Sequence, residues 1–214
     1  AYMVEALGLH GGEKVLEIGA GSGYAAAVLA EIAGEVFAVE RIATLADGAA
    51  RSLSEAGYRN VHVRHADGTE GWKDEAPFDA ILVSAGAPDI PKSLMRQLKI
   101  GGQMVIPVGS DLRSQELVRV RRTAEDEFER EDIADVRFVP LIGREGWESE
   151  ECAWEQRSPR VVQARPTVSL SLPGLIAKHG DVFTSVEEAD IEPLVERAGN
   201  ARLVLIGEAS HGTS

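Results

Sequence analysis

The sequence predicts an α/β protein with a doubly wound, mostly parallel sheet, followed by the opening of a second, truncated domain. Three observations support this prediction. Short apolar runs alternate with helix-like stretches over residues 14–108, a glycine cluster follows the first apolar run, and the regular alternation stops after Gly109. Such alternation places helices on both faces of a parallel sheet.

Five apolar runs are expected to form the parallel strands. Each is short, rich in Val, Ile, Leu or Phe, and bounded by glycine or polar residues. This pattern is typical of strands that are buried on both faces of a sheet. The runs are Lys14–Ile18, Glu35–Glu40, Val61–Arg64, Phe78–Val83 and Gln103–Val108.

Helices are expected between these runs, because apolar residues recur there at helical spacing. Glycines follow several of these stretches, and glycine most readily adopts the left-handed conformation that ends a helix. A further helix is expected at the start of the chain. The four stretches are Tyr2–Leu9, Tyr24–Ile32, Ile42–Ala56 and Pro91–Leu98.

The pattern changes after Gly109. Residues Glu116–Val120 alternate between apolar and polar and predict the edge strand of a hairpin. Residues Thr123–Asp132 are mostly polar and are expected to form a turn region. Apolar residues return at Val136–Leu141.

We divide the sequence into three parts. Residues 1–143 form the first domain, and residues 144–178, rich in Glu, Arg, Ser and Pro without a clear period, form a linker or extension. Residues 179–214 begin a second domain, in which Ser185 and Glu188 resemble the capping box of a helix. The sequence begins and ends inside expected elements, so we expect both domains to be truncated.

Composition excludes several classes of function. The chain has 214 residues and a net charge of −13, and an acidic surface repels phosphate backbones, so no nucleic-acid partner is expected. No run approaches the roughly 18 apolar residues that a membrane span needs. The single cysteine, Cys152, excludes an internal disulfide and fits a reducing compartment, so we expect a cytoplasmic protein. The histidines lack metal-ligand spacing, and no metal site is expected.

The main chemical signal is the glycine loop after the first strand. Gly19, Gly21 and Gly23 alternate with other residues, and Glu17 precedes them. Glycines permit a tight turn and let backbone N–H groups approach a ligand closely. Dinucleotide sites need a glycine where this chain has Tyr24, which disfavours a nicotinamide-dependent oxidoreductase. The loop instead suits a nucleoside without a pyrophosphate, whose cationic amine Glu17 would face; a plain strand-to-helix turn is the structural alternative.

Polar residues also follow the next strands. Glu40 ends the second strand 17 residues after Gly23, where an acidic residue hydrogen-bonds a ribose in Rossmann-type sites. Asp67-Gly68 follows the third strand and suits contacts to adenine, and Ser84 with small neighbours follows the fourth, leaving room for a methyl donor. The alternatives are a solvated strand-end Glu, an Asp-Gly turn and an ordinary loop.

Residues Val15–Tyr24 resemble the first motif of class I S-adenosylmethionine-dependent methyltransferases, which have a Rossmann-like fold. Further stretches, in order and at the family's spacing, resemble the protein-L-isoaspartate O-methyltransferase family across residues 1–143. These stretches are Ala66–Gly68 with Gly71-Trp72, Ala76–Ile81, Ala85–Pro88 with Ile90-Pro91, Gln97–Gly102 running into Val105–Gly109, and Arg137–Leu141.

The resemblance implies methyl transfer from S-adenosylmethionine to the free carboxylate of L-isoaspartyl residues in damaged proteins or peptides. By position it implies a cofactor site formed by Glu17, Gly19, Gly21, Ser22, Gly23, Glu40, Arg41, Asp67, Gly68, Ser84 and Ile142. It also implies that Val139, Pro140 and Leu141 lie near the substrate.

One departure from the family pattern concerns the substrate side. The family carries an Ile-Ser-x-Pro segment just upstream of the opening helix, and its Ser helps to hold the substrate carboxylate. This sequence starts after that segment, so no catalytic residue is assigned. We expect an incomplete acceptor site and little or no methyl transfer to isoaspartyl peptides by this chain, and ready transfer by a version extended upstream. Two alternatives stay open: a class I methyltransferase for a small molecule, which the acceptor would distinguish, and a cofactor-binding module without catalysis.

The tail carries a second signal. The apolar run Leu203–Ile206 leads into Glu208 and His211, which could act as a general acid and base on water. This stretch resembles the start of the erythromycin esterase family, whose Gly-Glu-x-x-His motif supplies a catalytic Glu and His. A polar loop is the alternative. The family's remaining catalytic groups are not in the sequence, so no hydrolase activity is expected.

We expect that deleting residues 179–214 leaves cofactor binding intact, because this tail is predicted to belong to a second domain. The melting temperature of the first domain should change little for the same reason. Calorimetric titration and thermal unfolding of the two chains measure both quantities. A large loss of cofactor affinity or of stability would show that the tail belongs to the first domain.

Overall fold

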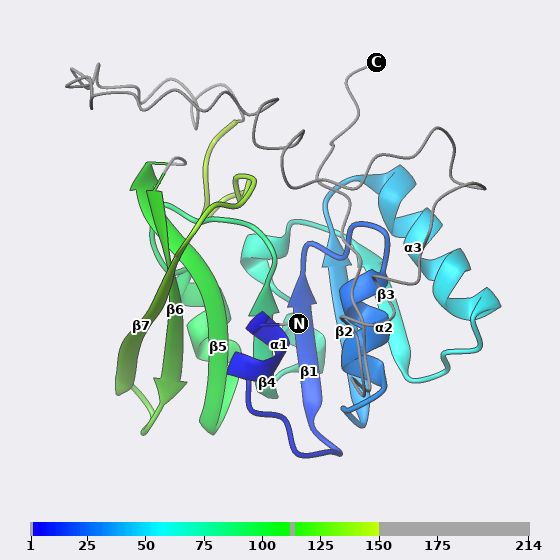
Figure 1. The fold of residues 1–214 in the computed structure, drawn as a ribbon, viewed down its shortest axis with the longest axis horizontal. Coiled ribbons are helices and arrows are strands. Elements are labelled where there is room, and N and C mark those ends of the chain that lie inside the picture. The colour runs from blue at the N-terminus through cyan, green and yellow to red at the C-terminus, as the bar shows by residue number, and fades with distance from the viewer. Residues whose placement is uncertain (1, 112–113, 150–214) are drawn as a thin grey trace, which may run out of the picture. The chain divides into compact units, whose positions relative to one another are not determined.

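The computed structural model describes residues 2–111 and 114–149 (Figure 1). The predictions for the tail, including Glu208, His211 and the esterase-like segment, lie outside the described residues, as does most of the expected linker. Within the described ranges, no helix is long and apolar enough to cross a membrane.

A seven-stranded sheet forms the centre of the described structure, with the strand order β3-β2-β1-β4-β5-β6-β7. The first five strands in this order are parallel, whereas β6 runs antiparallel to both β5 and β7. The predicted mostly parallel α/β sheet is therefore confirmed. The strands are β1 Lys14–Ile18, β2 Glu35–Glu40, β3 Val61–His65, β4 Phe78–Val83, β5 Leu98–Asp111, β6 Ser114–Arg122 and β7 Phe128–Val136.

Helices lie on both faces of the sheet. Figure 1 shows α1, α2 and α3 on the near face, while α4 and two 3-10 turns, η1 and η2, belong to the other face. The elements are α1 Tyr2–Ala6, α2 Tyr24–Ala30, α3 Ala43–Glu55, η1 Gly68–Glu70, η2 Lys73–Glu75 and α4 Lys92–Gln97.

The core has two halves because successive side chains of a strand point to opposite faces. On the face of α4, the buried residues include Leu16, Ile18, Phe37, Val39, Ile81, Val83 and Leu94. On the face of α2 and α3, they include Val15, Val36, Ala38, Leu82, Leu29 and Leu53. The central strands are thus apolar on both sides, and this explains their continuous hydrophobic runs.

The antiparallel edge of the sheet differs from the prediction. The region Thr123–Asp132 is not only a turn, because β7 begins at Phe128, and β6 is not the edge strand, because β7 pairs along its outer side. The sequence pattern concealed β7 because most of its side chains are exposed and charged.

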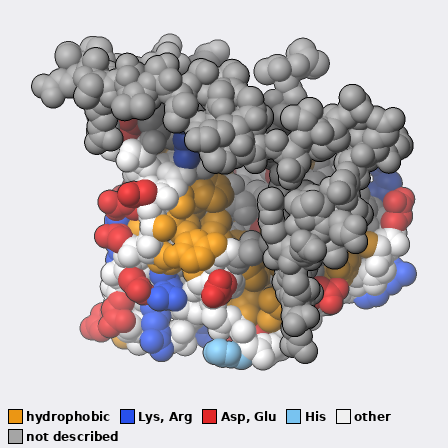
Figure 2. Space-filling view, in the orientation of Figure 1, with side chains coloured by type: hydrophobic (Ala, Val, Ile, Leu, Met, Phe, Trp, Pro, Cys, Tyr) orange, Lys and Arg blue, Asp and Glu red, His pale blue; other side chains and the backbone are white. Residues whose placement is uncertain are grey.

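Acidic and basic side chains lie close together on this side of the molecule (Figure 2). Ion pairs between the strands add to the apolar contacts of Phe128, Ile133 and Val136 with the core. Arg130 Nη2 lies 2.9 Å from Glu116 Oε2 on β6, and Arg119 of β6 pairs with Glu131 of β7. Each exposed ion pair of this kind stabilises the folded protein by less than about 1 kcal/mol. The backbone hydrogen bonds between β6 and β7 therefore also help to hold β7 in place.

Two glycines provide a matched test of packing. A Cβ on Gly34 would lie 2.9 Å from the Gly12 carbonyl oxygen, whereas a Cβ on Gly48, inside α3, would have no atom within 4 Å. We expect Gly34→Ala to lower the free energy of unfolding by about 1–3 kcal/mol. Gly48→Ala should raise it by about 0.5–1 kcal/mol. Urea unfolding measures both, and a stable Gly34→Ala variant would contradict the close approach.

Candidate cofactor and substrate site

The predicted glycine loop lies at the carboxyl ends of the parallel strands, between β1 and α2. Gly19, Gly21 and Gly23 have φ angles of 87°, 53° and 86°. These angles lie in the left-handed region that other residues rarely adopt, so the loop requires glycine at all three positions. The Gly19 amide donates to the Val39 carbonyl at 2.8 Å, which fixes the start of the loop on β2.

The three glycines differ in the space around them. A Cβ on Gly23 would lie 3.1 Å from Leu53 Cδ1, so this glycine also allows α2 to pack against α3. A Cβ on Gly19 would lie 3.7 Å from the Ser84 Cβ atom. A Cβ on Gly21 would meet no atom within 4 Å. The loop is therefore open at Gly21, where a ligand can approach the backbone.

Glu40 ends β2 as predicted and holds the glycine loop. Its side chain is 6% exposed. Oε2 accepts a hydrogen bond from the Gly21 amide at 2.9 Å, and Oε1 accepts one from the Ile42 amide at 2.9 Å. Each carboxylate oxygen has a second lone pair, so Glu40 can still accept hydrogen bonds from a ligand hydroxyl.

Glu17 is fully buried in β1, and neither of its carboxylate oxygens has a hydrogen-bond partner. Its register partners are Ala38 on β2 and Leu82 on β4, both members of the apolar core on the face of α2 and α3. Burial, and then the charge of Glu40, raise the pKa of Glu17 to about 8. A buried carboxylate without a partner is costly, so this position suits a cationic ligand group.

Asp67 stabilises the turn that follows β3, the structural alternative that the sequence left open for it. Its Oδ1 accepts hydrogen bonds from the Thr69 amide at 2.9 Å and the Thr69 hydroxyl at 2.7 Å, so it caps η1. Its Oδ2 accepts a hydrogen bond from the Arg144 amide at 2.8 Å. Gly68 is required by packing, since a Cβ there would lie 2.5 Å from Ile18 Cγ2.

The other predicted cofactor residues lie around the same strand ends. Ser84 is half-buried, and its amide continues the β4 ladder by donating to the Ile18 carbonyl at 2.8 Å. Ser22 is exposed in the glycine loop. Arg41 is exposed, and its carbonyl oxygen lies 3.0 Å from His65 Nε2.

The predicted substrate segment runs beside the loop that follows β4. The Gly86 amide donates to the Val139 carbonyl at 2.7 Å, and the Leu141 amide donates to the Gly86 carbonyl at 2.8 Å. Pro140 forms an isolated parallel bridge with Gly86. Val139 is 63% exposed whereas Leu141 is buried, so the segment has one face toward solvent and one anchored in the core.

Two further residues anchor this segment. Gln115 was not singled out in the sequence, and Trp147 falls in the expected linker. Gln115 of β6 is buried, accepts a hydrogen bond from the Phe138 amide at 2.7 Å and donates to the Phe138 carbonyl at 3.3 Å. Trp147 is buried, packs with Ile142 and donates from Nε1 to the Gly86 carbonyl at 3.0 Å. Gln115 stands between Ser114 and Glu116 at the polar start of β6, so nothing in the sequence signals that its side chain is buried.

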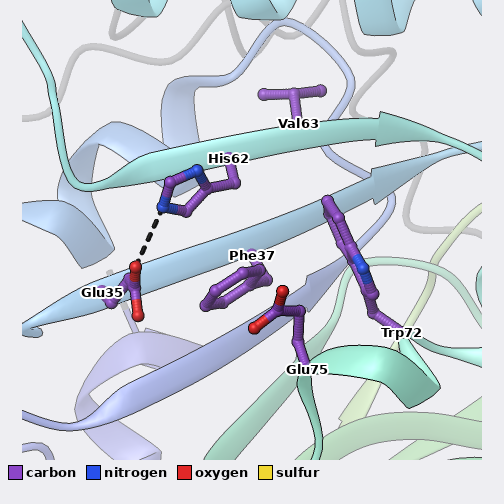
Figure 3. A pocket seen from close by; sticks show the side chains of 6 residues that line it. All are labelled: Glu35, Phe37, His62, Val63, Trp72 and Glu75. Carbon is purple, nitrogen blue, oxygen red and sulfur yellow. Dashed lines mark hydrogen bonds and ion pairs between the residues drawn. The ribbon is translucent and has the colours of Figure 1, made fainter.

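A hollow away from the glycine loop lies near the amino-terminal ends of β2 and β3. It has a volume of about 400 Å³ and is lined by the side chains shown in Figure 3: Glu35, Phe37, His62, Val63, Trp72 and Glu75. The ammonium of Lys14 lies 4.6 Å from the centre of the Phe37 ring and 2.9 Å from Glu75 Oε2. Since the chain supplies its own cation to these aromatic and acidic groups, we do not assign a ligand here. In the described residues, no cluster of three His, Cys, Asp or Glu could hold a metal ion.

Comparison with known families covers the part of the chain that contains the glycine loop. Residues 1–146 match the sequence profile of Protein-L-isoaspartate(D-aspartate) O-methyltransferase (PCMT). The chain belongs to this family. The resemblance found in the sequence over residues 1–143 is thereby confirmed, while the esterase-like tail remains a prediction.

Relatives in the PCMT family agree over the same part of the chain. A protein-L-isoaspartate O-methyltransferase of Rhodopseudomonas palustris (strain ATCC BAA-98 / CGA009) is 63% identical over 153 residues, covering 72% of this chain and 70% of that protein. A second, from Rhodopseudomonas palustris (strain HaA2), is 59% identical over 165 residues, covering 77% of this chain and 66% of that protein. The chain thus spans about two thirds of the length of these relatives.

Solved structures show the same fold. A protein-L-isoaspartate O-methyltransferase has a TM-score of 0.64 and 30% identity, covering 68% of this chain and 47% of that chain. A Plasmodium falciparum protein, described as a PCMT in complex with S-adenosyl-L-homocysteine, has a TM-score of 0.57 and 23% identity, covering 65% of this chain and 71% of that chain. The class I methyltransferase fold expected from the sequence is confirmed.

The buried Glu17 predicts a dependence of stability on pH. Its pKa in the folded protein is about 8, against an ordinary value of 4.5, so the folded state holds an extra proton between these values. This contribution to stability is fully present below pH 4.5 and is lost as the pH rises toward 8. We expect Glu17→Gln, which cannot ionise, to become progressively more stable than the wild type across this window, by on the order of a few kcal/mol.

Thermal unfolding from pH 5 to 9 measures the difference between the two proteins. The unsatisfied amide of the variant adds a constant offset, so only the trend with pH is diagnostic. Glu129→Gln, at an exposed position of β7, is the control and should show no trend. A difference between Glu17→Gln and wild type that does not vary with pH would mean that Glu17 is already ionised in the folded protein.

Proposed function

We propose that this chain binds S-adenosylmethionine at the glycine loop and transfers its methyl group to the free carboxylate of L-isoaspartyl residues in damaged proteins or peptides. The observation that carries the proposal is the open glycine loop flanked by two buried acidic side chains, Glu17 and Glu40, in a member of the PCMT family. The substrate class is favoured by the names of the relatives.

The residues present fit the methionine end of this cofactor. The Gly21 position is open, and the unpartnered oxygens of Glu17 lie in the strand that leads into the loop. An ammonium group near Glu17 would supply the missing partner and lower the pKa of this carboxyl, because an opposite charge favours the ionised form. Ser22, in the loop, and Ser84, beside Gly19, would line the same end.

The nucleoside end would lie along the ends of β2 and β3. Glu40 retains lone pairs for the ribose hydroxyls. Arg41 follows it directly, and Asp67 with Gly68 follows β3, where adenine would be placed. Because the Asp67 carboxylate already accepts three hydrogen bonds, we assign it mainly to shaping the backbone of this pocket. Ile142 would approach from the substrate segment.

When bound, S-adenosylmethionine would supply a methyl group on a positively charged sulfur, an electrophile that a carboxylate oxygen attacks directly. A carboxylate with a pKa of about 4 is already ionised at neutral pH, so the chain needs no general base. Its residues instead bind and orient, an effect worth up to roughly 7–11 kcal/mol in favourable cases. Val139, Pro140 and Leu141 would lie beside the acceptor carboxylate.

A methyl-transfer assay tests the proposal. A version of the chain that carries the family's Ile-Ser-x-Pro segment upstream should label an isoaspartyl peptide with radioactive methyl from S-adenosylmethionine, and should leave the peptide of the same sequence with normal aspartate unlabelled. Transfer to a small nucleophile but not to the isoaspartyl peptide would favour the small-molecule alternative. Cofactor binding without transfer to any acceptor, even when the upstream Ile-Ser-x-Pro segment is present, would contradict the proposed activity.

We expect Glu40→Gln to weaken binding of S-adenosylhomocysteine by about 1–3 kcal/mol, the scale of hydrogen bonds to a charged group. Calorimetric titration measures this affinity. Glu35→Gln removes a carboxylate from the exposed beginning of the same strand and should bind as tightly as the wild type. Equal affinity of Glu40→Gln and wild type would remove Glu40 from the site.

A further inference from the structure

The residues that follow the substrate segment, 143–147, form a strap across η1 and α4. The Arg144 amide donates to Asp67 Oδ2 at 2.8 Å, and the Glu145 amide donates to the Thr69 hydroxyl at 3.1 Å. Gly143 lies so close to Asp67 that a Cβ on it would collide with the carboxylate. The strap therefore lies directly on the turn that follows β3.

Glu145 is the polar centre of the strap. Its carboxylate accepts two hydrogen bonds from one residue at the start of α4, from the Ser93 amide at 2.9 Å and from the Ser93 hydroxyl at 2.5 Å. Partial burial raises the pKa of Glu145, but the hydrogen bonds from Ser93 and from the Lys92 amide, together with the charge of Arg96, outweigh this effect and hold the pKa below its ordinary value. Glu145 is thus a carboxylate at neutral pH, and hydrogen bonds to an ionised group are the strong ones.

The strap connects to the substrate segment through Gly86. The Trp147 amide donates to the Leu141 carbonyl at 2.8 Å, and both the Trp147 ring and the Leu141 amide donate to the Gly86 carbonyl. A continuous series of hydrogen bonds therefore runs from Asp67 through Thr69 and the strap to Leu141. Along this series, the side chain of Glu145 supplies the link to α4.

We propose that Glu145 is a positioning residue for the acceptor: by fixing the strap to Ser93, it holds Val139–Leu141 beside the loop after β4, where the isoaspartyl carboxylate would bind. This inference rests on the proposed function. Glu145 is half-buried and does not belong to the apolar core, whereas Trp147 and Leu141 are buried apolar residues. Its loss should loosen the segment without unfolding the domain.

Glu145→Gln tests the proposal, because an amide can accept only one of the two hydrogen bonds from Ser93 and presents an N–H group to the other. Ser93→Ala removes the hydroxyl donor, and Ser93→Thr retains both donors and should behave as wild type. Glu148→Gln makes the same change of charge at an exposed position three residues further on and is the matched control.

We expect Glu145→Gln to raise the KM for an isoaspartyl peptide about tenfold, the scale of one lost charge-assisted hydrogen bond. The kcat and the Kd of S-adenosylhomocysteine should stay close to wild type, since Asp67 keeps its bonds to Thr69. Hydrogen exchange of the amides in residues 141–147 should accelerate in Glu145→Gln and Ser93→Ala, but not in Ser93→Thr or Glu148→Gln. The melting temperature should change little.

The outcomes separate the two proposals. If the wild type, assayed with the upstream Ile-Ser-x-Pro segment present in every variant, does not methylate the isoaspartyl peptide, the proposed function is contradicted and the positioning role with it. Hydrogen exchange still reports whether Glu145 holds the strap. If the wild type is active, faster exchange with an unchanged KM shows a purely structural role and overturns the inference. Unchanged exchange and unchanged KM overturn it as well.

Discussion

The hydrogen bond from the Gly21 amide to Glu40 Oε2 joins the ends of two neighbouring strands at the point where a ligand would enter. The loop contains three glycines with positive φ angles, and glycine restricts the backbone less than any other residue, so this hydrogen bond limits its freedom. With Glu40 buried and bonded on both oxygens, the loop is fixed before any ligand binds. The Glu40 carboxylate also disfavours a negative charge on Glu17. The two acidic residues therefore differ in role: Glu40 holds the backbone of the loop, and Glu17 has no hydrogen-bond partner.

Gly86 plays a corresponding part on the acceptor side. Its backbone amide and carbonyl bind Val139, Leu141 and Trp147, and Gln115 packs so closely on it that any side chain there would collide. One residue without a side chain thus gathers β6, the substrate segment and the strap. On this side the close neighbours of the glycine require the absence of a Cβ atom, whereas at Gly19 and Gly21 the positive φ angles require it.

Much of this arrangement was predictable from the sequence, since the buried parallel strands are continuous apolar runs and the glycine loop has a distinctive spacing. Glu17 and Glu40 could be placed at the sheet edge because parallel strands share one carboxyl edge. The polar strand β7 could not, because charged pairs between strands leave no apolar alternation to read. The contact of Glu145 with Ser93 joins residues 52 positions apart. The sequence around either residue gives no sign that the two side chains meet.

The polar outer strand has a consequence for how these molecules meet one another. Among the described residues, β7 is the last strand on its side of the sheet, and such an edge offers unpaired backbone groups to any extended chain. Glu129, Arg130, Glu131 and Asp132 place charges of both signs along it. A second strand that docked there would have to strip water from these groups, so the charges that obscured β7 in the sequence also protect the sheet from growing by strand addition.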